Sequence, residues 1–173
     1  HRCTEVSAAN IGETVTVMGW VQTRRNLGAL IFVDLRDRSG ILQILFDENT
    51  VGSEGFKKAY GIRNEYVIAV VGKVQKRSGA VNENLKTGDI EVVAEQIRVL
   101  SESETPPFPI EENINTKEDL RLKYRCLDLR RPDLQSNIMM RSKVATLTRA
   151  FLANEGFLEI ETPMLTKSTP EGA

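Results

Sequence analysis

Between residues 14 and 100 the chain alternates apolar and polar positions with the two-residue period of half-buried β-strands. Short turns rich in Gly, Asn and Ser separate five such runs, at 14–21, 30–35, 41–46, 66–71 and 90–94. A polar segment with spaced aromatics, 53–60, lies between the third and fourth runs and is expected to be helical. This is the element order of an OB fold. The pattern therefore predicts a mainly β fold, a five-stranded OB-fold barrel over residues 1–100.

The pattern changes after residue 100. Residues 101–131 contain prolines and acids without periodicity, then a dense run of cations, and are predicted to be a linker and hinge. A helix is expected from Pro132, a favoured first-turn residue, to a C-terminal cap at Gly156. Its apolar positions recur every three or four residues: Met140, Val144, Leu147 and Phe151. Alternation over 158–161 predicts a short strand, so residues 132–173 have the form of the start of an α/β domain.

Composition limits the classes of function. The chain has 173 residues, is 40% hydrophobic and carries a net charge of −1, so it can form a core, and any nucleic acid must bind to a local patch. Cys3 and Cys126 form no CxxC pair, and His1 is the only histidine, which argues against a metal site and a Ser-His-Asp triad. No apolar run is long enough to span a bilayer, and no signal-peptide pattern opens the chain. These features predict a soluble, cytoplasmic protein without a membrane segment.

Candidate binding residues gather on the first three predicted strands. Arg24 and Arg25 end the first strand, Phe32 lies on the second and Gln43 on the third. OB folds bind single-stranded nucleic acid on this sheet, with aromatics stacking on bases and cations following the phosphates. A phenylalanine in an apolar run is more often a core residue, and arginines at a strand end are more often only solvated. Periodicity alone leaves both alternatives open.

The order of these residues resembles the anticodon-binding domain of bacterial-type aspartyl-tRNA synthetases. The matching segments are Gly19-Trp20-Val21, Arg24-Arg25, Ile31-Phe32, Leu35-Arg36-Asp37 and Gln43. The resemblance implies that Phe32 stacks on an anticodon base and that Gln43, Arg25 and Arg24 read the bases and their backbone. Residues 81–88 resemble the loop before the fifth strand of that family, which adds Asn82 and Glu91 to the implied anticodon residues. Thr23 departs from the family, where a basic residue often stands.

The second half resembles the same family. Residues 121–132 match its hinge, with Cys126 in place of an aromatic, and the resemblance suggests a phosphate contact at Arg130 or Arg131. Residues up to Pro163 resemble motif 1 of the class II synthetases, which implies a homodimer formed through this helix and strand. Thr169-Pro170-Glu171-Gly172-Ala173 resembles the mobile loop over the amino-acid pocket. By that likeness Glu171 pairs with the ammonium group of aspartate.

The resemblance implies an aspartate–tRNA ligase that uses ATP and Mg²⁺ to form an aspartyl-adenylate and then transfers aspartate to its tRNA. Motifs 2 and 3, which hold ATP in this class, do not occur in the 173 residues. We therefore expect no catalytic residue, no bound cofactor and no adenylate synthesis in this chain alone, but retained recognition of the anticodon loop. Two alternatives stay open: a non-catalytic OB module for RNA or single-stranded DNA, and a sister synthetase for asparagine or lysine, against which Glu171 argues.

Overall fold

A computed structural model describes residues 1–165 and 167. The chain divides into two compact units, His1–Pro107 and Phe108–Ala173, which are described separately below. The division of the sequence at residues 100 and 131 stays a prediction.

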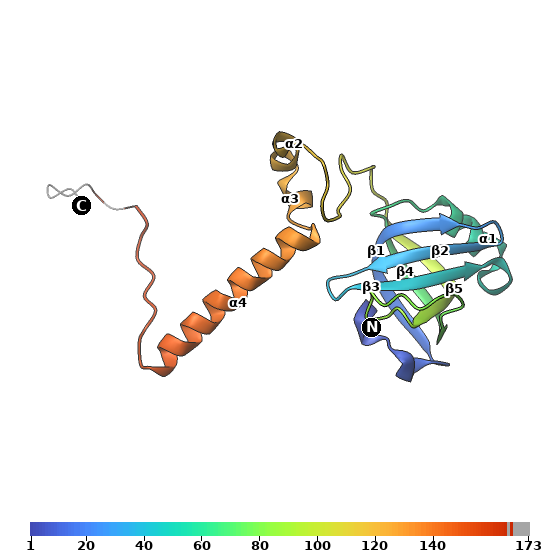
Figure 1. Cartoon of the computed structure of the whole chain (residues 1–173), viewed down its shortest axis with the longest axis horizontal. Coiled ribbons are helices and arrows are strands. Elements are labelled where there is room, and N and C mark those ends of the chain that lie inside the picture. The colour runs from blue at the N-terminus through green and yellow to red at the C-terminus, as the bar shows by residue number, and fades with distance from the viewer. Residues whose placement is uncertain (166, 168–173) are drawn as a thin grey trace. The chain divides into compact units, whose positions relative to one another are not determined.

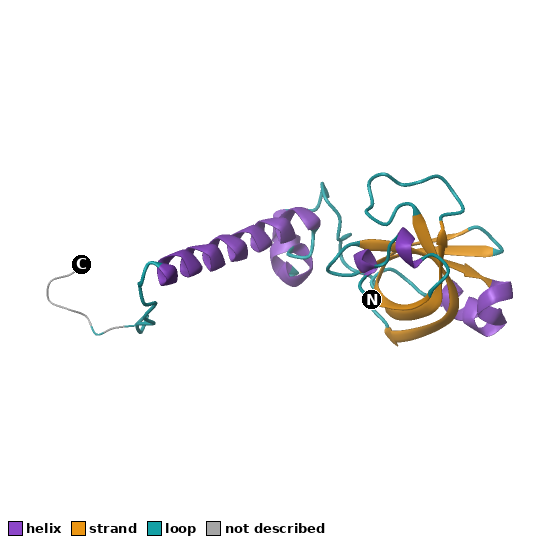
Figure 2. Ribbon diagram, turned by 90° about the horizontal axis from the view of Figure 1, so that it is seen from below, coloured by secondary structure: helices purple, strands orange, loops and turns teal. Residues whose placement is uncertain are grey.

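The first unit is a closed five-stranded sheet with one helix. Its strands are β1 (Thr14–Asn26), β2 (Leu30–Arg36), β3 (Ile41–Asp47), β4 (Val67–Lys76) and β5 (Ile90–Ser101), and α1 (Glu48–Gly61) follows β3. Two 3₁₀ turns, η1 (Cys3–Glu5) and η2 (Ala8–Asn10), precede them. The strands close in the order β1-β2-β3-β5-β4, with all pairs antiparallel except β3 and β5. Figures 1 and 2 show the curved sheet with α1 beside it. The predicted OB fold, with its helix between the third and fourth strands, is confirmed.

The length of β1 allows the sheet to close. Residues 14–20 pair with β4, whereas residues 20–26 pair with β2. Gly19 lies near the changeover, and a Cβ there would overlap the carbonyl oxygen of Arg36. The glycine therefore permits the close approach of β1 and β2.

The core of this unit follows the predicted alternation. On β2, Ile31, Val33 and Leu35 are fully buried, and the residues between them are only partly buried. By contrast, β3 is buried on both faces from Leu42 to Phe46. Its outward-facing residues are covered by other parts of the unit: the side chains of Arg25 and Arg77 lie on Gln43, and α1 packs against β3.

The second unit contains α2 (Glu118–Lys123), α3 (Arg125–Asp128) and α4 (Pro132–Asn154). The predicted long helix is confirmed, and Gly156 follows its end with a φ of +86°, the left-handed conformation of a C-terminal cap. The strand predicted over 158–161 is wrong for the structure, in which the described residues after Gly156 form no strand. Strands require a hydrogen-bonded neighbour, and no described segment pairs with this one. Glu171 lies outside the described residues.

Among the described residues, no helix combines the length and apolar character needed to cross a membrane. Nor does that part of the chain contain a group of three or more His, Cys, Asp or Glu side chains placed to hold a metal ion.

Candidate nucleic-acid interface

Each strand of the first unit contributes a polar side chain to one row on the outward-facing side of the sheet. In order around the sheet they are Thr23 on β1, Asp34 on β2, Gln43 on β3, Glu91 on β5 and Gln75 on β4. Thr23 is paired with Asp34, Asp34 with Gln43, and Gln75 with Glu91. The parallel pairing of β3 with β5 sets Gln43 beside Glu91, and these two side chains are hydrogen-bonded. We call these five residues the polar row.

Glu91 anchors one half of the polar row. Its side chain is fully buried, and three donors satisfy its carboxylate. Gln43 Nε2 donates to Oε2 at 2.8 Å, Gln75 Nε2 donates to Oε1 at 2.8 Å, and the Ser78 backbone N–H donates to Oε1 at 3.1 Å. A buried carboxylate needs such donors, because its desolvation would otherwise be unfavourable. Glu91 therefore fixes the amide of Gln43 rather than presenting a free carboxylate.

The oxygen of Gln43 faces two arginines. Arg77 Nη2 donates to Oε1 at 2.6 Å and Arg25 Nη2 donates to the same atom at 3.2 Å. With Glu91 on its nitrogen and the arginines on its oxygen, the amide has one orientation. One of the two hydrogens on Nε2 is donated to Glu91, and among the described residues no acceptor takes the other.

Arg77 was missed by the sequence reasoning, although it is a cation that follows β4 directly. Its Nη1 atom is buried and has no hydrogen-bond partner in the described part of the chain. A buried guanidinium nitrogen without a partner indicates a position at which an acceptor would be stabilised.

Phe32 belongs to the outer surface and not to the core. It is partly exposed and lies opposite Arg25 in the β1–β2 pairing, with the Arg25 Cζ atom 5.9 Å from its ring centroid. An arginine over an aromatic ring at this distance makes a cation–π contact. The structure thus removes the alternative that Phe32 is an ordinary core residue.

Phe32, Arg25, Gln43 and Arg77 line one open pocket of about 400 Å³. An aromatic ring, an amide and two guanidinium groups therefore converge on a space that can hold a nucleobase. The arrangement offers stacking, one amide hydrogen and positive charge.

Two of the predicted anticodon residues lie apart from this pocket. Arg24, next to Arg25 on β1, donates from Nη1 to the Tyr60 carbonyl oxygen at 2.8 Å, and its Cζ lies 5.5 Å from the Tyr60 ring centroid. Asn82, in the loop before β5, accepts the Asn84 backbone N–H through its side-chain oxygen at 3.1 Å. The structure brings together Arg25, Phe32, Gln43 and Glu91, and it does not bring Arg24 or Asn82 to them.

The hinge of the second unit is built around a buried carboxylate. Asp128 is fully buried and accepts from Arg121 Nε at 3.0 Å, Arg125 Nη1 at 2.6 Å and Arg131 Nη1 at 3.1 Å. Burial alone would raise the pKa of Asp128, but the hydrogen bonds from Arg131 and Arg121 outweigh it and hold the pKa below its usual value. Arg131 also donates to the Glu111 carbonyl oxygen and is itself buried. Arg131 is therefore a structural residue and is not placed as a phosphate contact.

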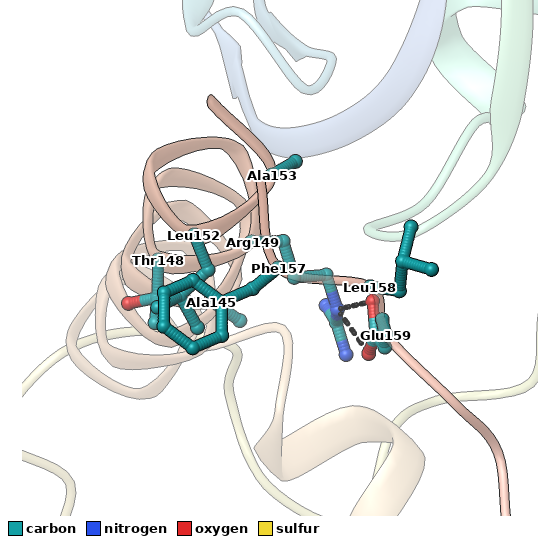
Figure 3. A pocket seen from close by; sticks show the side chains of 8 residues that line it. All are labelled: Ala145, Thr148, Arg149, Leu152, Ala153, Phe157, Leu158 and Glu159. Atoms are coloured by element: carbon teal, nitrogen blue, oxygen red, sulfur yellow. Dashed lines mark hydrogen bonds and ion pairs between the residues drawn. The ribbon is translucent and has the colours of Figure 1, made fainter. Parts of the chain in front are cut away.

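A second pocket, of about 530 Å³, lies between the end of α4 and the segment that follows it (Figure 3). Its lining is largely apolar and includes Leu152, Phe157 and Leu158. Arg149 Nε donates to both carboxylate oxygens of Glu159 at 2.9 and 3.1 Å, which ties the segment back to the helix.

Comparison with protein families finds two matches in succession. Residues 15–100 match the OB-fold nucleic acid binding domain, and residues 117–173 match the class II tRNA synthetases for D, K and N. The chain therefore contains an OB-fold nucleic acid binding domain followed by a segment of the class II tRNA synthetase family.

The most informative relatives are similar over all 173 residues. The chain is 75% identical to an aspartate–tRNA ligase of Agathobacter rectalis and 73% identical to an aspartate–tRNA(Asp/Asn) ligase of Lachnoclostridium phytofermentans, in both cases over 100% of this chain and 29% of the relative. The chain thus spans about 29% of the length of these curated relatives. It belongs to the aspartate–tRNA ligase family.

Solved structures agree at the level of the fold. The aspartyl-tRNA synthetase of Entamoeba histolytica superposes with a TM-score of 0.86 at 26% identity, covering 94% of this chain and 39% of that one. The asparaginyl-tRNA synthetase of Pyrococcus horikoshii gives 0.81 at 29% identity, covering 99% and 40%. One of these structures is an aspartyl-tRNA synthetase and the other an asparaginyl-tRNA synthetase, so the fold alone does not distinguish the two.

Proposed function

We propose that the protein to which this chain belongs attaches L-aspartate to its tRNA through an aspartyl-adenylate, and that residues 1–107 recognise the anticodon loop. The identity of 73–75% over the whole chain supports the reaction. The observation that carries the role of this chain is the pocket formed by Arg25, Phe32, Gln43 and Arg77.

In this proposal the Phe32 ring stacks on one anticodon base, a contact worth about 1–3 kcal/mol. The free hydrogen on Gln43 Nε2 donates to an acceptor on a base edge. Arg25 and Arg77 supply positive charge for the adjacent phosphates, so a chain with a net charge of −1 can still bind RNA locally. Glu91 acts behind the surface, through Gln43.

The remaining parts of the proposal concern the whole protein. ATP and Mg²⁺ supply the activation of aspartate, and none of the described residues is assigned to either. Glu171 pairs with the ammonium group of aspartate, and the protein forms a homodimer through α4 and the segment after it. We place the protein in the cytoplasm.

The first experiment is a binding titration of the 173-residue chain with the aspartate tRNA and with the same tRNA carrying a swapped anticodon, at fixed salt. Phe32→Ala should weaken cognate binding about 5- to 150-fold, the equivalent of one lost stacking contact. Phe157→Ala removes an exposed phenylalanine outside the first unit and serves as the matched control, with no expected effect. Equal binding of both tRNAs by the unmodified chain would leave a general OB-fold RNA binder and would refute anticodon reading.

The reaction is tested on the full-length protein by pyrophosphate exchange with aspartate, asparagine or lysine. We expect exchange with aspartate alone. Exchange that depends on asparagine or lysine would assign the protein to a sister synthetase and leave the OB-fold assignment intact.

A further inference from the structure

The polar row begins at Thr23, a residue with no place in the anticodon proposal. Thr23 is directly opposite Asp34 across β1 and β2, and its hydroxyl donates to Asp34 Oδ2 at 2.6 Å. This is the short distance of a hydrogen bond to a charged acceptor. The other carboxylate oxygen, Oδ1, accepts from Arg25 Nη2 at 3.3 Å. Thr23 and Arg25 therefore hold opposite oxygens of one carboxylate.

The same guanidinium nitrogen of Arg25 also donates to Gln43 Oε1 at 3.2 Å, and the group lies over the Phe32 ring. The side chain of Arg25 is 52% exposed and that of Asp34 is 23% exposed. An ion pair this accessible contributes little to folding stability. Its main effect is on geometry, because an arginine otherwise samples many rotamers and would lose that freedom on binding.

We propose that Thr23 and Asp34 are positioning residues that fix Arg25 for anticodon discrimination. The hydroxyl of Thr23 orients the Asp34 carboxylate so that Oδ1 faces Arg25. Asp34 then holds the guanidinium between the Phe32 ring and the Gln43 amide, where it forms one wall of the pocket. This inference rests on the proposed anticodon reading.

Arg25 affects RNA binding in two separate ways, through its charge and through its position. Its charge attracts phosphates whatever its rotamer, and that attraction sets the salt dependence of affinity. Its position relative to Phe32 and Gln43 affects which bases the pocket accepts, since sequence is read by contacts to base edges. Thr23→Val removes the hydroxyl but keeps the shape and every charge, so it should alter only the second effect.

The test uses the 173-residue chain with the aspartate tRNA and the swapped-anticodon tRNA, titrated at several salt concentrations. Thr23→Val should reduce the ratio of the two affinities about two- to tenfold, the range of one lost hydrogen bond. The salt slope should stay unchanged, because every charge is kept. Thr23→Ser, which keeps the hydroxyl, should restore the ratio. Thr16→Val, an exposed threonine on the same strand, is the matched control and should have no effect.

Asp34→Asn provides a second variant with a different signature. Loss of one negative charge beside the pocket should strengthen binding to both tRNAs. Because an asparagine at this position would bind Arg25 less tightly than the carboxylate does, the ratio of the cognate to the swapped-anticodon affinity should fall. A higher affinity with an unchanged ratio would overturn the positioning role of Asp34.

The outcomes distinguish this inference from the proposed function. If the unmodified chain does not prefer the cognate anticodon, anticodon reading fails and the inference fails with it. If the unmodified chain does prefer it and Thr23→Val keeps the full preference, only the inference is overturned. A lower melting midpoint for Thr23→Val, with the ratio unchanged, would assign the hydroxyl a structural role and would also overturn it.

Discussion

At the scale of single residues, Glu91 shows how a buried group controls an exposed one. All three of its partners are donors: two side-chain amides and the Ser78 backbone N–H. Glu91→Gln would place an amide nitrogen among these donors and leave at least one unsatisfied. We expect a loss of about 1–3 kcal/mol in the free energy of unfolding, measured by urea denaturation. Glu95→Gln, an exposed position on the same strand, is the control, and equal stability of both variants would contradict the role assigned to Glu91.

The two cysteines also differ at this scale. Burial, followed by repulsion from Asp37, raises the pKa of the Cys3 thiol to about 12, whereas Cys126 is exposed. Because the thiolate is the reactive form, we expect iodoacetamide at pH 8 to modify Cys126 alone in the folded chain. Mass spectrometry of peptides would check this, with a urea-denatured sample as the control in which both thiols react. Modification of Cys3 at a rate similar to that of Cys126 would refute the prediction.

At the scale of elements, the loop between β4 and β5 depends on Gly88. A Cβ at this position would overlap the carbonyl oxygen of Asn82, whereas a Cβ at Gly79 in the same loop would meet no atom within 4 Å. Gly88→Ala should therefore displace the loop and cost about 1–3 kcal/mol of stability. Gly79→Ala is the matched control and should retain stability in urea denaturation. If both variants behave alike, the close approach at Gly88 is not a constraint.

The helices of the hinge depend on Asp128, because its carboxylate accepts from arginines of α2 and α3 and from Arg131 at the start of α4. Its pKa is lowered in the folded chain, so its contribution is fully present above the unfolded pKa of about 4 and is lost as the pH falls through the lower folded value. We expect helical circular dichroism to decrease in that acidic range. Trp20, the only tryptophan, reports the first unit separately.

Asp128→Asn should lower helicity already at neutral pH, since it removes the charge opposite the buried Arg131 and the more exposed Arg121 and Arg125. Because Arg131 is then left buried without a charged partner, we expect a cost of about 3–5 kcal/mol. Asp119→Asn, at an exposed position on α2, should leave both the helicity and its pH profile unchanged. An unchanged profile in Asp128→Asn would show that another group governs the acid transition.

The elements also show what a sequence can predict. Period-two alternation and the spacing of apolar residues on α4 are local patterns, so the sequence alone predicts five strands and two helices. The strand at 158–161 was wrong because a strand requires a partner that local pattern cannot supply. Arg77 and Gln75 were missed because they meet Gln43 and Glu91 only when β4 and β5 close the sheet. Arg24 was grouped with Arg25, although successive residues of a strand face opposite sides.

At the scale of the whole molecule, the exposed apolar face of α4 predicts that the chain associates with another protein surface. Met140, Val144, Leu147 and Phe151 are 55–64% exposed. An apolar surface of this kind is unfavourable in water and is typical of a surface that contacts another protein surface. The sequence predicts that these four residues form a dimer surface, and in the described chain they lie exposed on one face of α4.

We expect the chain to form a dimer through this face of α4. A charge at Leu147 would have to be buried without a partner, so Leu147→Glu should raise the dimer dissociation constant at least about 100-fold, the equivalent of several kcal/mol. Sedimentation velocity across a dilution series should show a dimer that dissociates for the unmodified chain, and a monomer throughout for Leu147→Glu. Ser142→Glu adds the same charge at another exposed position of α4 and should behave as the unmodified chain does. If the chain dimerises through α4, the two variants will differ in this way. If the unmodified chain is monomeric at every concentration, the dimer prediction is wrong and another surface must cover the helix.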